Sequence, residues 1–236
     1  MNRLVVLLLV LGAVSCGRKP APAEAEAPLK NVVSAAPVAP AKSPSTDVPR
    51  IVVLGDSLTA GLGLDPRDAY PAVLERKLNQ HGYRFVVINA GVSGDTSADG
   101  LRRLDWSLEG NVDVLILALG ANDGLRGLPP SQMKQNLQRI ITRARQRGIR
   151  VVLAGMEAPP NWGERYTNQF RAVFIDLAES NHLPLVPFLL MGVAGMPSLN
   201  QADGLHPTAR GAEMVADTLL PVLETVLKTE RPTGSR

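Results

Sequence analysis

The sequence has little of several residue types, and each shortage excludes a class of protein. Cys16 is the single cysteine among 236 residues, so the chain has no internal disulfide. Aromatic residues make up 4% of the chain and the formal net charge is +3. Residues 1–49 hold five Lys or Arg against three acids, which leaves residues 50–236 nearly neutral. A nearly neutral domain with few aromatics lacks the basic surface that nucleic acid requires, so we expect no nucleic-acid partner.

Two widespread active-site motifs are also absent. The chain has no Gly-x-Ser-x-Gly, which excludes the nucleophile elbow of the α/β-hydrolases. It has no Gly-x-x-x-x-Gly-Lys loop either, which excludes a phosphate-binding loop of the P-loop type.

The first sixteen residues have the pattern of an export signal. Arg3 precedes the apolar run Leu4 to Leu11, and "GAVSC" follows and ends at Cys16. The run is too short to span a bilayer, and a positive start, apolar core and small residues are typical of a signal peptide. A cysteine at this point resembles the lipobox of bacterial lipoproteins, although Ala13 replaces the usual leucine, so a plainly secreted product stays open. We expect a signal peptide over residues 1–16 and an exported, periplasmic or cell-surface lipoprotein attached to a bacterial membrane through Cys16.

Residues 17–49 differ in composition from the rest of the chain. Proline and alanine dominate this segment, and it has no apolar periodicity. Such a composition cannot bury enough surface to offset the entropy of ordering, so we predict a disordered linker. One domain is then expected over residues 50–236.

The domain alternates between two kinds of segment. Short, nearly continuous apolar runs predict strands that are buried on both faces of a parallel sheet. Between them, apolar residues repeat at helical spacing. This alternation predicts a three-layer α/β/α sandwich with a mostly parallel, five-stranded sheet. The expected strands are Ile51–Leu54, Phe85–Ile88, Val112–Leu119, Ile149–Ala154 and Leu185–Val186, and helices are expected to end at Gly82 and Gly148, to include 170–177 and to cover 207–227.

Small polar residues and glycines follow the predicted strands. In folds of this class ligands bind at the carboxyl ends of the strands, so these residues should meet at one edge of the sheet. A serine at a strand-to-helix turn can act as a nucleophile, and the glycines beside it leave room for a substrate near the backbone. The segments are Gly55-Asp56-Ser57, Asn89 to Asp95, Gly120 to Gly124, and Asp203 to Pro207 before the last helix.

These residues fit the roles of an acyl-transfer enzyme. His206 can take the proton of Ser57, and Asp203, three residues earlier, can hold the other ring nitrogen. The backbone N–H groups of Ser57 and Gly94 and the side-chain amide of Asn122 can donate to an oxyanion. Asp56 is expected to organise the turn through its carboxylate.

The four segments resemble the conserved blocks of the SGNH hydrolases, also called the GDSL family. "GDSLTAGLG", "NAGVSGDTS", "LGANDGLRG" and "DGLHP" stand in family order from about Ile51 to the last helix. The resemblance implies a flavodoxin-like fold, a nucleophile at Ser57, an oxyanion hole that includes Gly94 and Asn122, and a triad completed by Asp203 and His206. It also implies no metal and no organic cofactor. "SGDTSADGLRRL" and "NDGLRGLPP" look most similar to the bacterial thioesterase I, lysophospholipase L1 and arylesterase group.

Two segments are candidates for binding the acyl part of a substrate. Residues 123–128 form a predicted loop in which Asp123, Gly124, Leu125 and Leu128 are expected to contact the acyl chain and close over it. The apolar segment Pro187 to Leu199 can either pack in the core or form the wall of an acyl groove.

The expected function is hydrolysis of acyl ester or thioester bonds in small aryl esters or lysophospholipids by a monomeric enzyme. One alternative is an envelope carbohydrate O-deacetylase, which an open, aromatic-lined groove would favour. Another is a non-catalytic envelope lipoprotein, which the loss of a triad residue would favour.

Overall fold

The structure is a computed structural model, and it describes residues 48–229. Five parallel strands form one sheet in the order β2-β1-β3-β4-β5. They are β1 (Arg50–Gly55), β2 (Val86–Gly91), β3 (Val112–Ala118), β4 (Arg150–Ala154) and β5 (Leu185–Val186). This finding confirms the predicted α/β fold. Because the chain passes from β1 to β2 on one side and returns to β3 on the other, β1 lies at a topological switch point.

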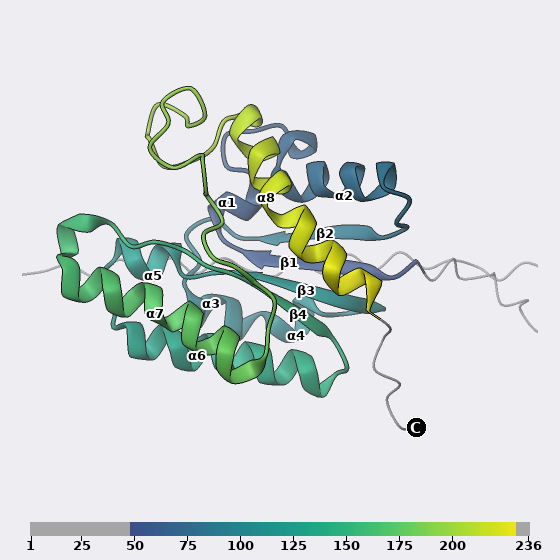
Figure 1. The fold of residues 1–236 in the computed structure, drawn as a ribbon, viewed down its shortest axis with the longest axis horizontal. Coiled ribbons are helices and arrows are strands. Elements are labelled where there is room, and N and C mark those ends of the chain that lie inside the picture. The colour runs from purple at the N-terminus through teal and green to yellow at the C-terminus, as the bar shows by residue number, and fades with distance from the viewer. Residues whose placement is uncertain (1–47, 230–236) are drawn as a thin grey trace, which may run out of the picture. The chain divides into compact units, whose positions relative to one another are not determined.

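The helices cover both faces of the sheet (Figure 1). On one face α2 (Tyr70–Gln80) packs against α8 (Ala209–Lys228). On the other face lie α3 (Ser97–Arg102), α4 (Leu104–Ser107), α6 (Pro130–Gln146) and α7 (Glu164–Asn181). Three short elements stand close to the carboxyl edge of the sheet: α1 (Ser57–Ala60), α5 (Ala121–Leu125) and the 3-10 turn η2 (Pro160–Trp162), while a second 3-10 turn, η1 (Pro66–Asp68), precedes α2.

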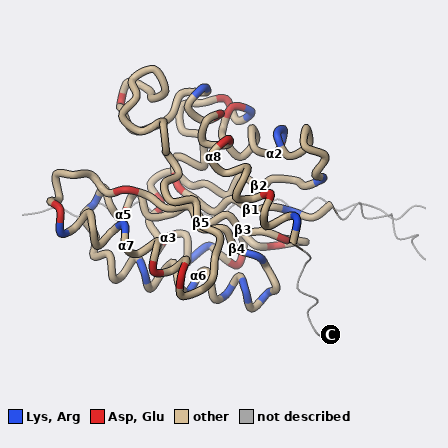
Figure 2. Tube along the Cα trace, viewed as in Figure 1, with Lys and Arg blue, Asp and Glu red and all other residues tan. Residues whose placement is uncertain are grey.

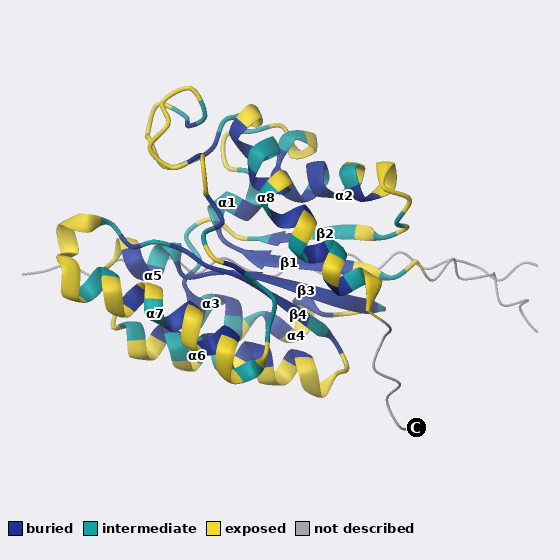
Figure 3. Cartoon of the chain, in the orientation of Figure 1, coloured by how far each residue is buried: buried dark blue, intermediate teal, exposed yellow. Residues whose placement is uncertain are grey.

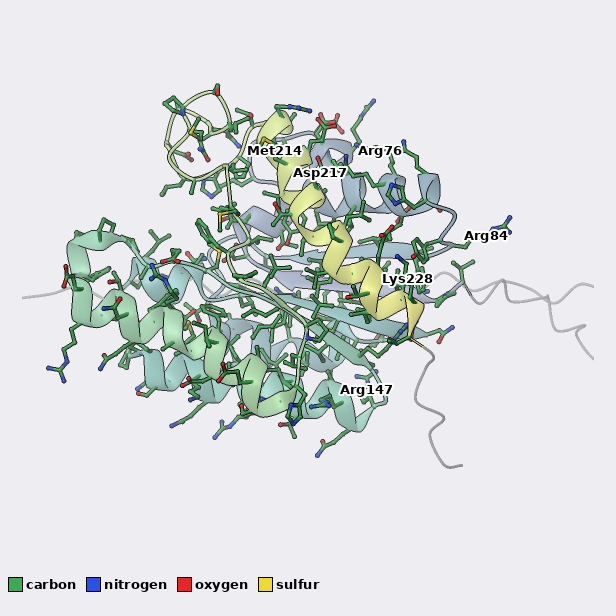
Figure 4. The ribbon with its side chains drawn as sticks, in the orientation of Figure 1. Arg76, Arg84, Arg147, Met214, Asp217 and Lys228 are labelled. Atoms are coloured by element: carbon green, nitrogen blue, oxygen red, sulfur yellow. The ribbon has the colours of Figure 1, made fainter. Side chains whose placement is uncertain are left out.

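The core lies between the sheet and its two helical layers. Every residue of β3 is buried, and β1 is buried from Ile51 onward, as continuous apolar strands of a covered parallel sheet should be (Figure 3). The outward face of α8 carries the exposed residues Asp217 and Lys228, which Figure 4 labels. Asp217 forms an ion pair with Lys77 of α2 at 2.7 Å.

Strand β2 differs from its prediction. We expected it over Phe85–Ile88, with Asn89, Ala90 and Gly91 in a loop, but the strand runs from Val86 through Gly91. Residues 89–91 pair with Val53, Leu54 and Gly55 of β1. The loop-forming character of Asn and Gly is therefore overridden by pairing with a buried neighbour strand.

No helix among residues 48–229 is both long and apolar enough to cross a membrane. The predicted signal peptide, the predicted linker and Cys16 lie outside the described residues.

Candidate active site

Ser57 is the first residue of α1 and lies two residues after the end of β1. Asp56 is the N-cap, and its Oδ1 accepts a hydrogen bond from the N–H of Leu58 at 3.0 Å, as expected for a residue that organises this turn. The Asp56 carboxyl is 1% exposed, and burial raises its pKa to about 6. A Cβ on Gly55 would lie 1.9 Å from Thr59 Oγ1, so glycine is required for α1 to pack against the strand.

The structure brings Ser57 and His206 together although 149 residues separate them. Nε2 of His206 lies 2.9 Å from Oγ of Ser57, and Nδ1 lies 2.6 Å from Oδ2 of Asp203. The other carboxylate oxygen of Asp203 accepts from the backbone N–H groups of Leu205 and His206 at 2.9 and 3.0 Å. Two contacts with His206 hold the pKa of Asp203 well below its usual range. The larger effect comes from the backbone N–H of His206 and the next from its ring. Asp203 is therefore an ionised acceptor, suited to stabilise an imidazolium.

A short hairpin fixes the loop that carries His206. Asn200 and Pro207 form an antiparallel bridge, and the N–H of Gln201 donates to the carbonyl of His206 at 2.7 Å. The side-chain amide of Gln201 donates to Leu62, in the loop after α1, at 2.7 Å. The loops that carry Ser57 and His206 are thus joined directly.

The two further oxyanion candidates lie on separate segments, the loop after β2 and the helix α5. Gly94 follows β2 and has a φ of 87°, which favours glycine, and its carbonyl accepts from Arg126 at 2.7 Å. Asn122, in α5, donates one side-chain N–H to the carbonyl of Asp95 at 3.0 Å. An amide nitrogen carries two hydrogens, so a second one is available to an oxyanion.

A cavity of about 310 Å³ opens beside these groups. Ser57, Asn122 and His206 are among the residues that line it. Its other walls are mainly apolar, and Glu157, the one ionisable side chain among the remaining lining residues, is paired with Arg171 at 2.6 Å. The apolar lining includes Leu58, Leu125, Met156, Phe188, Leu190 and Leu205. The segment Pro187 to Leu199 therefore contributes Phe188, Leu190 and Ala194 to the wall of this cavity.

The structure corrects the prediction of a loop over residues 123–128. Residues through Leu125 are helical, as part of α5, and only the remainder is a turn. Asp123 is 3% exposed, and its carboxylate accepts from the backbone N–H and the hydroxyl of Ser97, both at 2.7 Å. A Cβ on Gly124 would lie 3.0 Å from the ring of Phe170. Of the four predicted acyl contacts only Leu125 lines the cavity, whereas Asp123, Gly124 and Leu128 lie outside its lining.

The segment after β4 was missed by the sequence reasoning. Met156, Glu157, Ala158, Pro159 and Pro160 all line the cavity. Their position after a predicted strand was the available signal, because the residues that follow the other strands were selected as site candidates for the same reason. They contain no serine, histidine or amide that would have drawn attention.

Among residues 48–229 no group of three or more His, Cys, Asp or Glu side chains is arranged to hold a metal ion. The loop between β5 and α8 has Asp203 as its single Asp or Glu and contains no Lys or Arg, whereas the outer helices α2, α6, α7 and α8 carry many charges (Figure 2).

The sequence is similar to a family of known hydrolases. The model of the GDSL-like lipase/acylhydrolase family matches residues 53–214. The esterase TesA of Pseudomonas aeruginosa is 42% identical over 178 residues, which cover 75% of this chain and 89% of that protein. The thioesterase 1/protease 1/lysophospholipase L1 of Escherichia coli K12 is 36% identical over 175 residues, with 74% and 83% covered.

Solved structures show the same similarity in three dimensions. The crystal structure of TesA superimposes with a TM-score of 0.72 at 41% identity, covering 75% of this chain and 99% of that chain. The esterase EstA from Pseudoalteromonas, in a structure inhibited by monoethylphosphonate, superimposes with a TM-score of 0.71 at 32% identity, covering 76% of this chain and 99% of that one.

Proposed function

Since the chain belongs to the GDSL-like lipase/acylhydrolase family and is a serine esterase, we propose that Ser57, His206 and Asp203 form its catalytic triad. One observation carries the proposal: the ring of His206 stands between Ser57 Oγ at 2.9 Å and Asp203 Oδ2 at 2.6 Å. This is the order of contacts that nucleophilic acyl transfer requires.

The reaction begins when Ser57 Oγ attacks the carbonyl carbon of the ester while Nε2 of His206 takes the hydroxyl proton. The tetrahedral oxyanion accepts hydrogen bonds from the N–H groups of Ser57 and Gly94 and from Asn122. The imidazolium, stabilised by Asp203, then gives its proton to the leaving alcohol or thiol, which leaves an acyl-serine. A water molecule that is deprotonated by His206 hydrolyses this intermediate and restores the free Ser57 hydroxyl.

The substrates that fit are neutral acyl esters or thioesters with an apolar acyl chain. The chain would lie in the cavity between Met156, Phe188 and Leu190, where burial of apolar surface contributes about 0.8 kcal/mol for each methylene group. The names of the relatives, esterase, arylesterase and thioesterase/lysophospholipase, cover this range of substrates. Phe188 is the one aromatic residue that lines the cavity in the described part of the chain, which gives a carbohydrate deacetylase little stacking surface.

We further propose that the enzyme is exported and tethered to a membrane. This rests on sequence alone: the apolar run Leu4 to Leu11, the lipobox-like Cys16 and the Pro/Ala-rich segment 17–49.

A labelling experiment tests the proposed nucleophile. A fluorophosphonate should label the wild-type chain at Ser57, and Ser57→Ala should fold normally, take up no label and lose nearly all hydrolysis of p-nitrophenyl butyrate. Ser131→Ala, at an exposed serine of α6, is the matched control and should behave as wild type. Label at another serine, or an active Ser57→Ala variant, would overturn the assignment.

A series of p-nitrophenyl esters from acetate to palmitate tests the substrate class. We expect kcat/KM to rise from acetate to medium chains and to fall once the chain outgrows the cavity. A preference for acetate without dependence on chain length would favour the deacetylase instead.

A further inference from the structure

An ion pair connects the segments that carry the proposed oxyanion donors, and it has no role in the reaction steps described above. Nε of Arg103 donates to Oδ2 of Asp95 at 2.6 Å, and the two side chains are 17% and 13% exposed. Withdrawing two charges this far from water has a desolvation cost, which the geometry of the surrounding hydrogen bonds must offset.

The guanidinium of Arg103 also holds the strand that leads to Ser57. One terminal nitrogen donates to the carbonyl of Gly55, two residues before the nucleophile, at 2.8 Å. The other donates to Oγ of Ser107 at 3.2 Å, which fixes the guanidinium within its own helical region.

Asp95, the partner of Arg103, belongs to the loop of Gly94 and also contacts Asn122. It follows Gly94 directly in the chain, and its carbonyl accepts the side-chain amide of Asn122 at 3.0 Å. Its own N–H closes a turn on Val92, whose N–H in turn donates to Gly55. The backbone beside Ser57, the backbone beside Gly94 and the contact that orients Asn122 are therefore connected through one Arg–Asp pair.

We infer that Asp95 and Arg103 are positioning residues that set the mutual placement of the three oxyanion donors. This inference rests on the proposed function. Neither residue lines the cavity, so neither is expected to touch the substrate. Donors stabilise an oxyanion only when they are held about 2.7–3.1 Å from its position, and three donors on three separate segments need a common support to meet that condition.

The test replaces Arg103 by lysine in the full-length chain. Lysine keeps the charge opposite Asp95 but cannot make the planar set of directed bonds to Asp95, Gly55 and Ser107. We expect kcat for p-nitrophenyl butyrate to fall about 10- to 100-fold with KM changed less than about twofold, because the loss falls on the transition state.

A matched control is available at the opposite edge of the sheet. Arg150 and Asp113 form a second ion pair, with side chains 14% and 7% exposed, at the amino end of β4 and away from the cavity. Arg150→Lys removes comparable interactions and should lower the midpoint of urea unfolding while leaving kcat within about twofold of wild type. Equal loss of kcat in both lysine variants would overturn the inference.

A double-mutant cycle asks whether the pair acts through the oxyanion hole. If it does, Arg103→Lys should reduce kcat much less when Asn122→Ala is already present, because part of its effect has been removed. Additive effects would indicate a merely structural role and overturn the inference. If Arg103→Lys does not fold, Asp95→Asn, which keeps the shape of the side chain, replaces it in the same cycle.

The two proposals can fail separately. If the triad proposal is wrong, Ser57 of the wild-type chain will take up no label. If only the present inference is wrong, Ser57 stays labelled and active, and the discrepancy appears only in the Arg103 and Asp95 variants.

Discussion

The buried carboxyl of Asp56 should make the protein's stability depend on pH in a way that one substitution isolates. Oδ1 of Asp56 accepts from Leu58, but Oδ2 has no hydrogen-bond partner among the described residues. Burial raises the pKa of this carboxyl from its ordinary 3.8 to about 6. The folded state therefore holds the proton more tightly than the unfolded chain does.

The sign and size follow from linkage. A carboxyl whose pKa is raised on folding costs no stability while it is protonated in both states. The cost develops as pH rises from about 3.8 to about 6 and is complete above that, where it amounts to about 3 kcal/mol. We expect the free energy of unfolding of Asp56→Asn, relative to wild type, to increase by about 2–3 kcal/mol between pH 4 and pH 8. The carboxylates whose pKa is lowered, such as Asp203 and Asp99, have the opposite sign, but they contribute equally to both proteins.

The assay is urea unfolding followed by circular dichroism at several pH values from 4 to 8. Asparagine can keep the bond to Leu58, and the buried amide nitrogen that it introduces adds an offset that does not vary with pH, so the change with pH is the measured quantity. Asp65→Asn is the control, because the N–H groups of Arg67 lower the pKa of Asp65, so this carboxyl is largely ionised in both states above pH 4 and its substitution should leave a nearly constant difference from wild type over this pH range. A difference between Asp56→Asn and wild type that stays flat or falls with rising pH would refute the reasoning.

Three other substitutions test separate parts of the site. Asn122→Ala should lower kcat about 10²–10³-fold with little change in KM, measured by steady-state hydrolysis of p-nitrophenyl butyrate, and an unchanged kcat would remove Asn122 from the oxyanion hole. Phe188→Trp should shift the preferred p-nitrophenyl ester toward shorter acyl chains, because the larger ring reduces the volume of the cavity, and an unchanged profile would mean that the acyl chain lies elsewhere. Cys16→Ser should release the protein from the membrane fraction with the specific activity of the domain intact, and a wild-type protein that carries no acyl chain would contradict the anchor.

The sheet could be predicted from the sequence because its strands are continuous apolar runs. Val112–Ala118 is buried at every position, so its continuous apolar pattern identifies it as a strand even when the neighbouring strands are unknown. The end of β2 was missed for the opposite reason: Asn89 and Gly91 are extended only because they pair with β1. A Cβ on Gly91 would also lie 2.2 Å from the backbone nitrogen of Ala60, so this glycine serves the packing of α1 and not a turn.

The ends of the strands predicted which residues meet, but not which of them face the cavity. Asn122, Asp123 and Gly124 are consecutive, and all three residue types are common in turns. In the structure they belong to α5, and Asp123 is directed to Ser97, which lies 26 residues earlier in the chain. A helix this short is not stable by itself, so its formation depends on such tertiary contacts, which a local pattern does not contain.

The glycines around Ser57 show how packing determines the position of the proposed nucleophile. The sequence suggested that Gly55 leaves room for a substrate, but a side chain there would collide with Thr59. A side chain on Gly91, in the neighbouring strand β2, would likewise collide with the backbone of Ala60. Both glycines therefore allow the four-residue helix α1 to lie directly against β1 and β2. Because α1 is too short to be stable alone, the position of Ser57 is set by this contact, by the Asp56 cap and by the Arg103 bond to Gly55. These glycines are thus required by the packing of the fold, and we expect the substrate to lie against the separate apolar walls that follow β4 and β5.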